Sequence, residues 1–177
     1  MCDSAVKLRP LERDDLELVA LWRRSSDASL AFLSPDPITV SGQGSWYEAY
    51  LKDKTDMMFV LCDADGHGVG TIALVDIDYR NQKAEFGRLL VADSVNRGKG
   101  FATAASLQLL EFARSQLHLS KIYLYVIGSN ARAVKLYEKL GFHIEGCFDR
   151  DVFAQGGWLD VLRMSIFLDS SWERRSR

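Results

Sequence analysis

The stretch LLVADSVNRGKGFA, residues 89–102, contains the features around which the rest of the chain is organised. It begins as an apolar strand, passes through a polar turn and reaches the sequence RGKG at 97–100, where a helix is expected to begin. Glycines let a backbone approach a ligand closely, and the N–H groups of a helix's first turn favour an anion. Arg97 and Lys99 add positive charge. The stretch predicts a pyrophosphate cradle, although glycines that only punctuate a strand-to-helix connection would give the same pattern.

Two better-known phosphate-binding patterns do not fit this cradle. A P-loop requires Ser or Thr directly after its lysine, and here Gly100 follows Lys99. The dinucleotide fingerprint requires a third Gly or Ala where this chain has Thr103. It also requires an acidic residue about 20 positions later, where the chain reads KIYLYV. The predicted cradle is therefore neither a P-loop nor a dinucleotide-binding fingerprint.

Length and composition indicate a single globular domain. The 177 residues are 47% hydrophobic and 26% charged, which is enough apolar material for one substantial core. The net charge of −2 gives no sign of a surface for nucleic acid. We expect one domain over residues 1–177, with 170–177 as a flexible tail.

Cysteines and histidines show no pattern for a metal site or a disulfide framework. The three cysteines lie far apart and form no Cys-x-x-Cys, and the three histidines lack the spacing of ligands. No apolar run approaches the ~20 residues that cross a bilayer, and the N-terminus lacks the apolar region of a signal peptide. The sequence therefore predicts no metal, no membrane association and a cytoplasmic location.

The hydrophobic pattern predicts an α/β (α+β) fold around one mixed sheet of about seven strands. Strands are expected at 5–9, 57–62, 69–77, 83–91, 120–127, 143–153 and 158–167. Helices are expected at 12–27, at 44–52, directly after the cradle, and from 130 to Gly141. Short turns make the sheet mostly antiparallel, and His67, between glycines in one of them, is expected to be exposed. The strand at 120–127 follows a helix and should be parallel to a neighbour.

The segment NARAVKLYEKLGF at 130–142, combined with the cradle, resembles the GNAT superfamily of acetyl-CoA-dependent N-acetyltransferases. The similarity covers most of the chain. It is greatest for the branch that contains spermidine, nucleotide amino-sugar and ribosomal-protein N-terminal acetyltransferases. The resemblance implies a GNAT-like sheet flanked by helices, acetyl-CoA as cosubstrate and a primary amine as acceptor. Members of this branch often form homodimers.

The resemblance also implies which residues bind coenzyme A. The strand before the cradle would pair through its backbone with the pantetheine amides, and the cradle would bind the pyrophosphate. Asn130 would hydrogen-bond the pantetheine arm, and it shares one helix face with Ala133 and Tyr137. The implied coenzyme-binding residues are Leu89, Leu90, Val91, Arg97, Gly98, Lys99, Gly100, Phe101, Ala102, Asn130 and Ala133.

Tyr137 and Glu85 are the candidate catalytic residues. By the resemblance Tyr137 would stand near the thioester sulfur, where a phenol of pKa about 10 can protonate a leaving thiolate. The alternative is a structural tyrosine whose hydroxyl binds a backbone carbonyl. Glu85 lies in an Ala-Glu-Phe sequence like that of polyamine acetyltransferases, and it is the candidate base or ammonium anchor. The alternative for Glu85 is an ion pair with Lys83 on the same strand face.

The acceptor pocket is the part that the sequence defines least. Four aromatic residues are candidates for its wall, although such residues are more often core: Trp22, Phe32, Trp46 and Tyr50. Segment 32–54 offers few acids for a polycation, namely Asp36, Glu48 and Asp53. This scarcity favours an amino sugar or another monoamine over a polyamine. The alternatives are a protein N-terminus as acceptor and a non-catalytic acetyl-CoA sensor.

Overall fold

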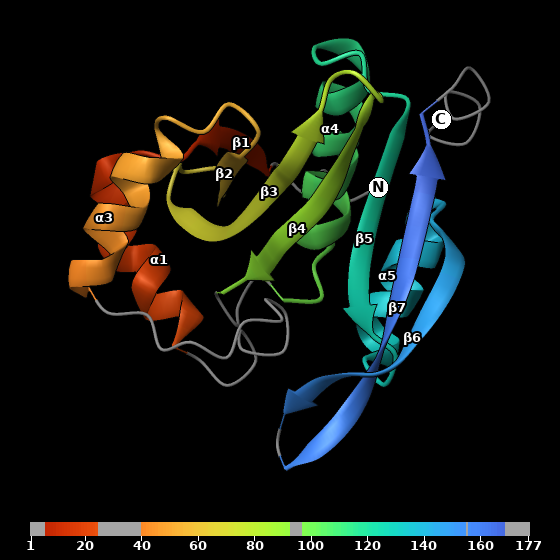
Figure 1. The fold of residues 1–177 in the computed structure, drawn as a ribbon. Helices are drawn as coiled ribbons and strands as arrows, with labels where there is room; N and C mark the ends of the chain where they lie inside the picture. Colours follow the sequence, from red (N-terminus) through yellow and green to blue (C-terminus); the bar gives the residue numbers. More distant parts are fainter. Residues whose placement is uncertain (1–5, 25–39, 93–96, 155, 169–177) are drawn as a thin grey trace.

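Seven strands form one sheet in the order β1-β2-β3-β4-β5-β7-β6 (Figure 1). The computed structural model describes residues 6–24, 40–92, 97–154 and 156–168. The strands are β1 (Lys7–Pro10), β2 (Met57–Cys62), β3 (Gly68–Asp78), β4 (Lys83–Val91), β5 (Lys121–Ile127), β6 (His143–Ala154) and β7 (Gly157–Phe167). Only β4 and β5 pair in parallel, and every other neighbouring pair is antiparallel. The predicted mixed, mostly antiparallel sheet is confirmed.

The described helices are a 3-10 turn η1 (Arg13–Asp15), α1 (Leu16–Arg23), α3 (Val40–Tyr50), α4 (Phe101–Ser115) and α5 (Ala131–Leu140). The helix predicted at 12–27 is split, because its first turn is a 3-10 turn and α1 ends at Arg23. Helix α3 begins four residues before the predicted Gly44, although glycines lower the helix propensity there. The predicted tail at 170–177 lies outside the described residues. Among the described helices, none is both long and apolar enough to cross a membrane.

Two hydrophobic cores lie on opposite faces of the sheet. Alternate residues of β2 divide between them, since Leu61 joins one core whereas Met58 and Val60 join the other. The main core lies under α4, which contributes an apolar stripe that includes Phe101, Ala105, Leu109 and Ala113. The second core lies under α1 and α3. Helix α4 therefore covers one face of the sheet, and α1 and α3 cover part of the other face.

Strands β4 and β5 pair for only a short distance and then separate. Their register covers Lys83 to Glu85 against Lys121 to Tyr123 and stops there. Figure 1 shows the two strands diverging beyond this point, with a gap that widens toward the end of β4. Beyond Glu85 the backbone groups on this edge of β4 do not pair with β5, so they can form hydrogen bonds with another partner.

A bulge in β4 follows directly after this separation. β3 and β4 pair at Ala73 with Gly87 and again at Thr71 with Leu90, so β4 has one extra residue in between. Arg88 lies in this extra stretch with a φ of +54°, a region that L residues seldom adopt. The buried Thr71 hydroxyl donates a hydrogen bond to the Arg88 carbonyl at 2.8 Å. Contacts from β3 therefore hold the bulge.

The bulge changes which side chains of β4 face the main core. Before it, Ala84 and Phe86 belong to that core, and after it Leu89 and Val91 pack against the same core. Regular alternation from Phe86 would have directed Arg88 to the core side. Arg88 lines the same cavity as Glu85 instead.

We expect Gly70→Ala to destabilise the protein by about 2 kcal/mol through overpacking. A Cβ at Gly70 would lie 2.0 Å from the Leu90 carbonyl oxygen, which is backbone and cannot move without disturbing the bulge. Urea denaturation measures the change. Gly146→Ala is the matched control, because a Cβ there meets nothing within 4 Å. Equal stability of the two variants would contradict the close approach of β3 to β4.

Candidate active site

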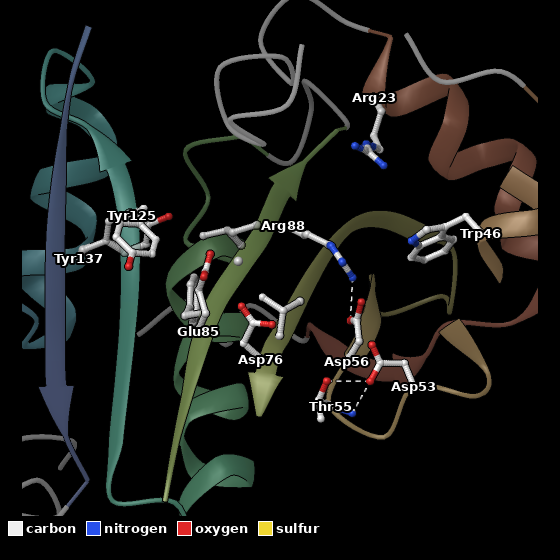
Figure 2. Close-up of a pocket in the computed structure, with 14 residues that line it drawn as sticks. Arg23, Trp46, Asp53, Thr55, Asp56, Asp76, Glu85, Arg88, Tyr125 and Tyr137 are labelled. Carbon is white, nitrogen blue, oxygen red and sulfur yellow. Dashed lines mark hydrogen bonds and ion pairs between the residues drawn. The ribbon is translucent and has the colours of Figure 1, made fainter. Parts of the chain in front are cut away.

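A cavity of about 520 Å³ lies beside the point where β4 leaves β5. Its walls come from β3, β4, β5, the helices α1, α3 and α5, and the segment before β2. Figure 2 shows Glu85 and two tyrosines, Tyr125 and Tyr137, at one end, and Asp53 and Asp56 at the other. The cavity therefore connects the separated strands with the second helical layer.

Four carboxylates and two guanidinium groups line this cavity. The acids are Asp53, Asp56, Asp76 and Glu85, and the bases are Arg23 and Arg88. One of the four acids is already neutralised, since Arg88 Nη1 lies 2.7 Å from Asp56 Oδ1. The described wall thus has an excess of negative charge, which favours a cationic ligand.

Glu85 is the carboxylate nearest to the separation of the strands, opposite Tyr123 in the register. Burial raises the pKa of Glu85, and the nearby Asp76 raises it further, whereas Arg88 and Arg163 lower it. The pKa is raised overall. Within the described part of the chain Glu85 forms no ion pair, so the alternative of a pair with Lys83 is not supported.

Tyr137 lines the cavity from α5. Its ring packs edge-on against Phe86 and Phe142, with ring centroids 5.8 and 5.9 Å away. Burial raises the pKa of the Tyr137 phenol to about 12. Its hydroxyl makes no hydrogen bond to any residue that the structure describes, which does not support the alternative of a purely structural tyrosine.

Asn130 caps the helix that positions Tyr137. Its Oδ1 accepts a hydrogen bond from the backbone N–H of Ala133 at 3.1 Å. Helix α5 ends at Gly141, whose φ of +98° suits a glycine. Asn130 therefore caps α5 through its side-chain oxygen, and its side-chain nitrogen takes no part in this contact.

The cradle has the geometry that the sequence predicts. Gly98 and Gly100 have φ values of +80° and +87°, and α4 begins at the next residue, Phe101. Arg97 Nε donates to the Val91 carbonyl at 3.0 Å, so this side chain ties the turn to the end of β4. The helix start presents backbone N–H groups that suit a pyrophosphate, and the open edge of β4 suits an amide-bearing arm. The site residues thus fit coenzyme A.

The four predicted aromatic residues have different locations. Trp46 lines the cavity. Trp22 and Tyr50 pack against the second core, and the Tyr50 hydroxyl accepts a hydrogen bond from the backbone N–H of Met58. Phe32 lies outside the described residues. The structure therefore places one of the four at the cavity wall.

Several cavity residues escaped the sequence analysis: Arg23, Asp56, Asp76, Arg88 and Tyr125. Acids were expected only from segment 32–54, where Glu48 pairs with Arg13 and Asp36 lies outside the described residues. Asp76 was the available signal, since it is a charged residue inside an apolar strand run, and the structure gives it a φ of +50°. The scarcity of acids that favoured a monoamine therefore does not apply to the folded site.

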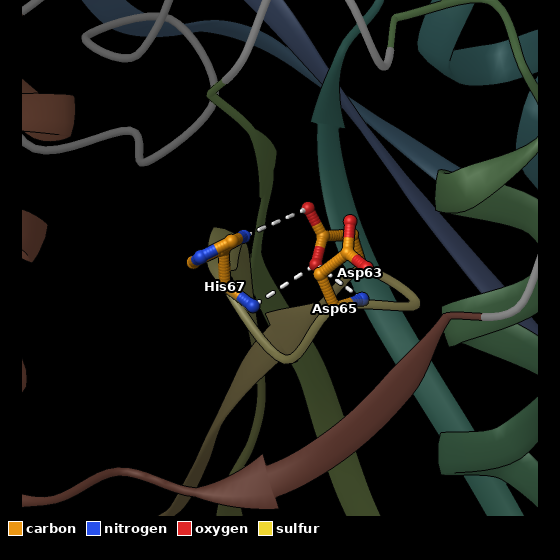
Figure 3. Close-up of side chains that lie close together, drawn as sticks. All are labelled: Asp63, Asp65 and His67. Atoms are coloured by element: carbon orange, nitrogen blue, oxygen red, sulfur yellow. Dashed lines mark hydrogen bonds and ion pairs between the residues drawn. The ribbon is translucent and has the colours of Figure 1, made fainter.

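A second cluster of acidic and histidine side chains lies in the turn between β2 and β3 (Figure 3). Asp63 Oδ1 accepts hydrogen bonds from the backbone N–H groups of Asp65 and His67 at 3.0 and 2.9 Å. The His67 side chain is 79% exposed, as predicted. These contacts account for the cluster as the internal structure of a tight turn.

Comparisons with known proteins agree with this geometry. A model of the acetyltransferase (GNAT) domain matches residues 5–143. Spermidine N(1)-acetyltransferase of Escherichia coli (strain K12) is 34% identical over 164 residues, which are 92% of this chain and 86% of that protein. An L-amino acid N-acetyltransferase of the same strain is 30% identical over 68% of this chain and 74% of its own length. The structure of spermidine N-acetyltransferase from Vibrio cholerae in complex with CoA and spermine has a TM-score of 0.88. That match has 29% identity and covers 97% of this chain and 98% of the other.

Separated strands, a glycine turn and a helix start around one cavity define the class of coenzyme A-dependent acyltransferases. The family match covers well over half of the chain. The chain belongs to the GNAT acetyltransferase family, and it uses acetyl-CoA to acetylate a small-molecule amine.

We expect Glu85→Gln to raise the free energy of unfolding at neutral pH. Because the pKa of Glu85 is raised in the folded state, its stabilising contribution is complete below the unfolded pKa of about 4.3. That contribution is lost as the pH rises through the folded pKa. The advantage of the variant should therefore vanish below about pH 4 and grow above it, as urea denaturation from pH 4 to 8 would show. An advantage independent of pH would contradict the raised pKa.

Proposed function

We propose that this protein N-acetylates a polyamine of the spermidine type. The observation that carries the proposal is the row of carboxylates along one cavity, from Glu85 beside the separated strands to Asp53 at the far end (Figure 2). A flexible chain with several ammonium groups matches such a row better than an amino sugar with a single ammonium group does. The spermidine acetyltransferases among the relatives support the same choice.

We propose Glu85 as the group that receives the proton of the attacking amine. An amine with a pKa of about 10.4 is neutral in only about one molecule in a thousand at pH 7.4, which corresponds to about 4 kcal/mol. Glu85 is half-buried on the cavity wall, and its raised pKa makes it a better base than an ordinary carboxylate. It can act directly or through one water molecule, and its charge also attracts the ammonium form beforehand.

We propose Tyr137 as the hydrogen-bond donor to the leaving sulfur. With a pKa of about 12 the phenol is protonated at neutral pH, as a donor must be. Full transfer to a thiolate of pKa about 8.5 would be uphill by about 5 kcal/mol. Donation of a hydrogen bond therefore comes first, and the proton follows only as charge develops on the sulfur.

Acetyl-CoA supplies the activated acetyl group when it is bound. The backbone of Leu89, Leu90 and Val91 would hold its pantetheine arm, since β5 leaves that edge of β4 open. The turn at 97–100 and the first residues of α4, Phe101 and Ala102, would hold the pyrophosphate through backbone N–H groups.

The acceptor class is tested by measuring thiol release from acetyl-CoA with spermidine, spermine, an amino sugar and a Ser-initiated peptide. We expect the highest kcat/KM for a polyamine. A preference for the sugar or the peptide would replace the proposal with one of these alternatives. Binding of acetyl-CoA with no turnover on any amine would contradict both Glu85 and Tyr137 as catalytic groups.

Removal of one cavity carboxylate should weaken acceptor binding. We expect Asp76→Asn to raise the KM for spermidine about threefold, the size typical of a partly exposed ion pair. Asp65→Asn in the β2–β3 turn is the matched control and should leave the KM unchanged. Equal effects at the two positions would show a nonspecific response to net charge.

The role of Tyr137 is tested by Tyr137→Phe. This variant keeps the ring that packs on Phe86 and Phe142 and removes only the hydroxyl. We expect kcat to fall about 100-fold while the KM for acetyl-CoA and the melting temperature stay close to those of the wild type. Undiminished kcat would remove Tyr137 from the mechanism.

A further inference from the structure

Arg88 occupies a position that the fold fixes from several sides. It lies in the bulge of β4, its carbonyl accepts a hydrogen bond from Thr71, and the Leu90 carbonyl oxygen nearby packs directly against Gly70, where a Cβ would lie only 2.0 Å from it. The side chain therefore extends from a rigid base into the cavity rather than into the main core. Such a fixed origin limits where the guanidinium can lie.

The guanidinium of Arg88 is held in the middle of the cavity by two partners. Nη1 lies 2.7 Å from Asp56 Oδ1, and the group lies over the Trp46 ring at 5.6 Å from the ring centre (Figure 2). The side chains of Arg88 and Asp56 are only 24% and 13% exposed. A charge-assisted bond with this little water around it is stronger than a surface ion pair.

An ammonium group of a polyamine would need the same carboxylate. Asp56 faces a cation that is tethered in place, and a free ligand competes poorly with a tethered one because the tether raises the local concentration. Arg23, at the end of α1, also faces Arg88 across this end, and burial together with Arg88 lowers the pKa of Arg23. The far end of the cavity therefore attracts cations less than the end with Asp76 and Glu85.

We propose that Arg88 is an internal counter-cation that determines acceptor length, because it keeps Asp56 from binding a distal ammonium group. The inference rests on the proposed function and specifies the substrate within it. The cavity then anchors the reacting amine near Glu85 and the next amine near Asp76, and it disfavours a third or fourth charge. Short polyamines are the preferred acceptors, and spermine is a poor one.

The test compares kcat/KM for putrescine, spermidine and spermine in the wild type and in Arg88→Gln. We expect the spermine-to-putrescine ratio to rise about fivefold in the variant, since Asp56 is released for the distal ammonium. The conservative Arg88→Lys should keep a ratio near that of the wild type. In Arg88→Gln/Asp56→Asn the gain should disappear. A folded Arg88→Gln protein with an unchanged ratio, or a gain that persists without Asp56, overturns the proposal.

A second measurement does not depend on the stability of any Arg88 variant. In the wild-type background, Asp56→Asn should change the KM for spermine by less than about twofold, whereas Asp76→Asn raises it about threefold. A larger effect at Asp56 than at Asp76 would show that Asp56 binds the acceptor itself and would overturn the proposal.

The same assays separate this inference from the proposed function. Turnover of polyamines by the wild type with no change of ratio in Arg88→Gln refutes the inference alone. Turnover of polyamines by Arg88→Gln but not by the wild type refutes the proposed function and, with it, the inference that rests on it. Absence of polyamine turnover and binding in both proteins refutes both.

Discussion

The site depends on one backbone constraint, the bulge that β3 imposes on β4. A glycine at position 70 lets the two strands approach closely, and the Thr71 hydroxyl holds the carbonyl of the bulged stretch. Beyond Glu85 the chain of β4 no longer pairs with β5, so its edge is open to a ligand. The same bulge turns Arg88 toward the cavity. The open edge of β4 and the inward-facing Arg88 thus lie within a few residues of each other on one irregular strand.

The cavity is a balance of opposite charges rather than a simple acidic pocket. Near the separated strands, burial and the neighbouring charge of Asp76 both raise the pKa of Glu85, and the two carboxylates together attract a cation. At the other end Arg88 neutralises Asp56. The electrostatic potential therefore changes along the cavity, and it is most negative at the end beside the phenol of Tyr137. An ammonium group would therefore be drawn to the end of the cavity at which we propose that it loses its proton.

Local sequence patterns predicted most of the fold, including the glycine turn and helix start that we propose to bind coenzyme A. Strand alternation, glycines 98 and 100, and the helix after Asn130 are local signals, and each lies where it was expected. The acceptor side was predicted poorly because it is assembled from segments far apart in the chain. Asp56 precedes β2, Asp76 interrupts β3, and Arg88 faces the cavity only because a bulge breaks the alternation. A bulge held by Thr71 has no signature in the residues of β4 themselves.

The two halves of the site also differ in how tightly they constrain the sequence. The donor half relies on backbone groups, namely the edge of β4 and the first turn of α4, and many side chains can accompany the same backbone geometry. The acceptor half would rely on side chains, which come from α1, α3, β3, β4 and the segment before β2. Apart from Arg88, these residues lie outside the bulge, so their substitution alters charge and size without disturbing it. A shared donor site can therefore serve relatives with different amines, and we propose that acceptor choice in this chain depends on cavity side chains such as Asp76 and Arg88 rather than on the fold.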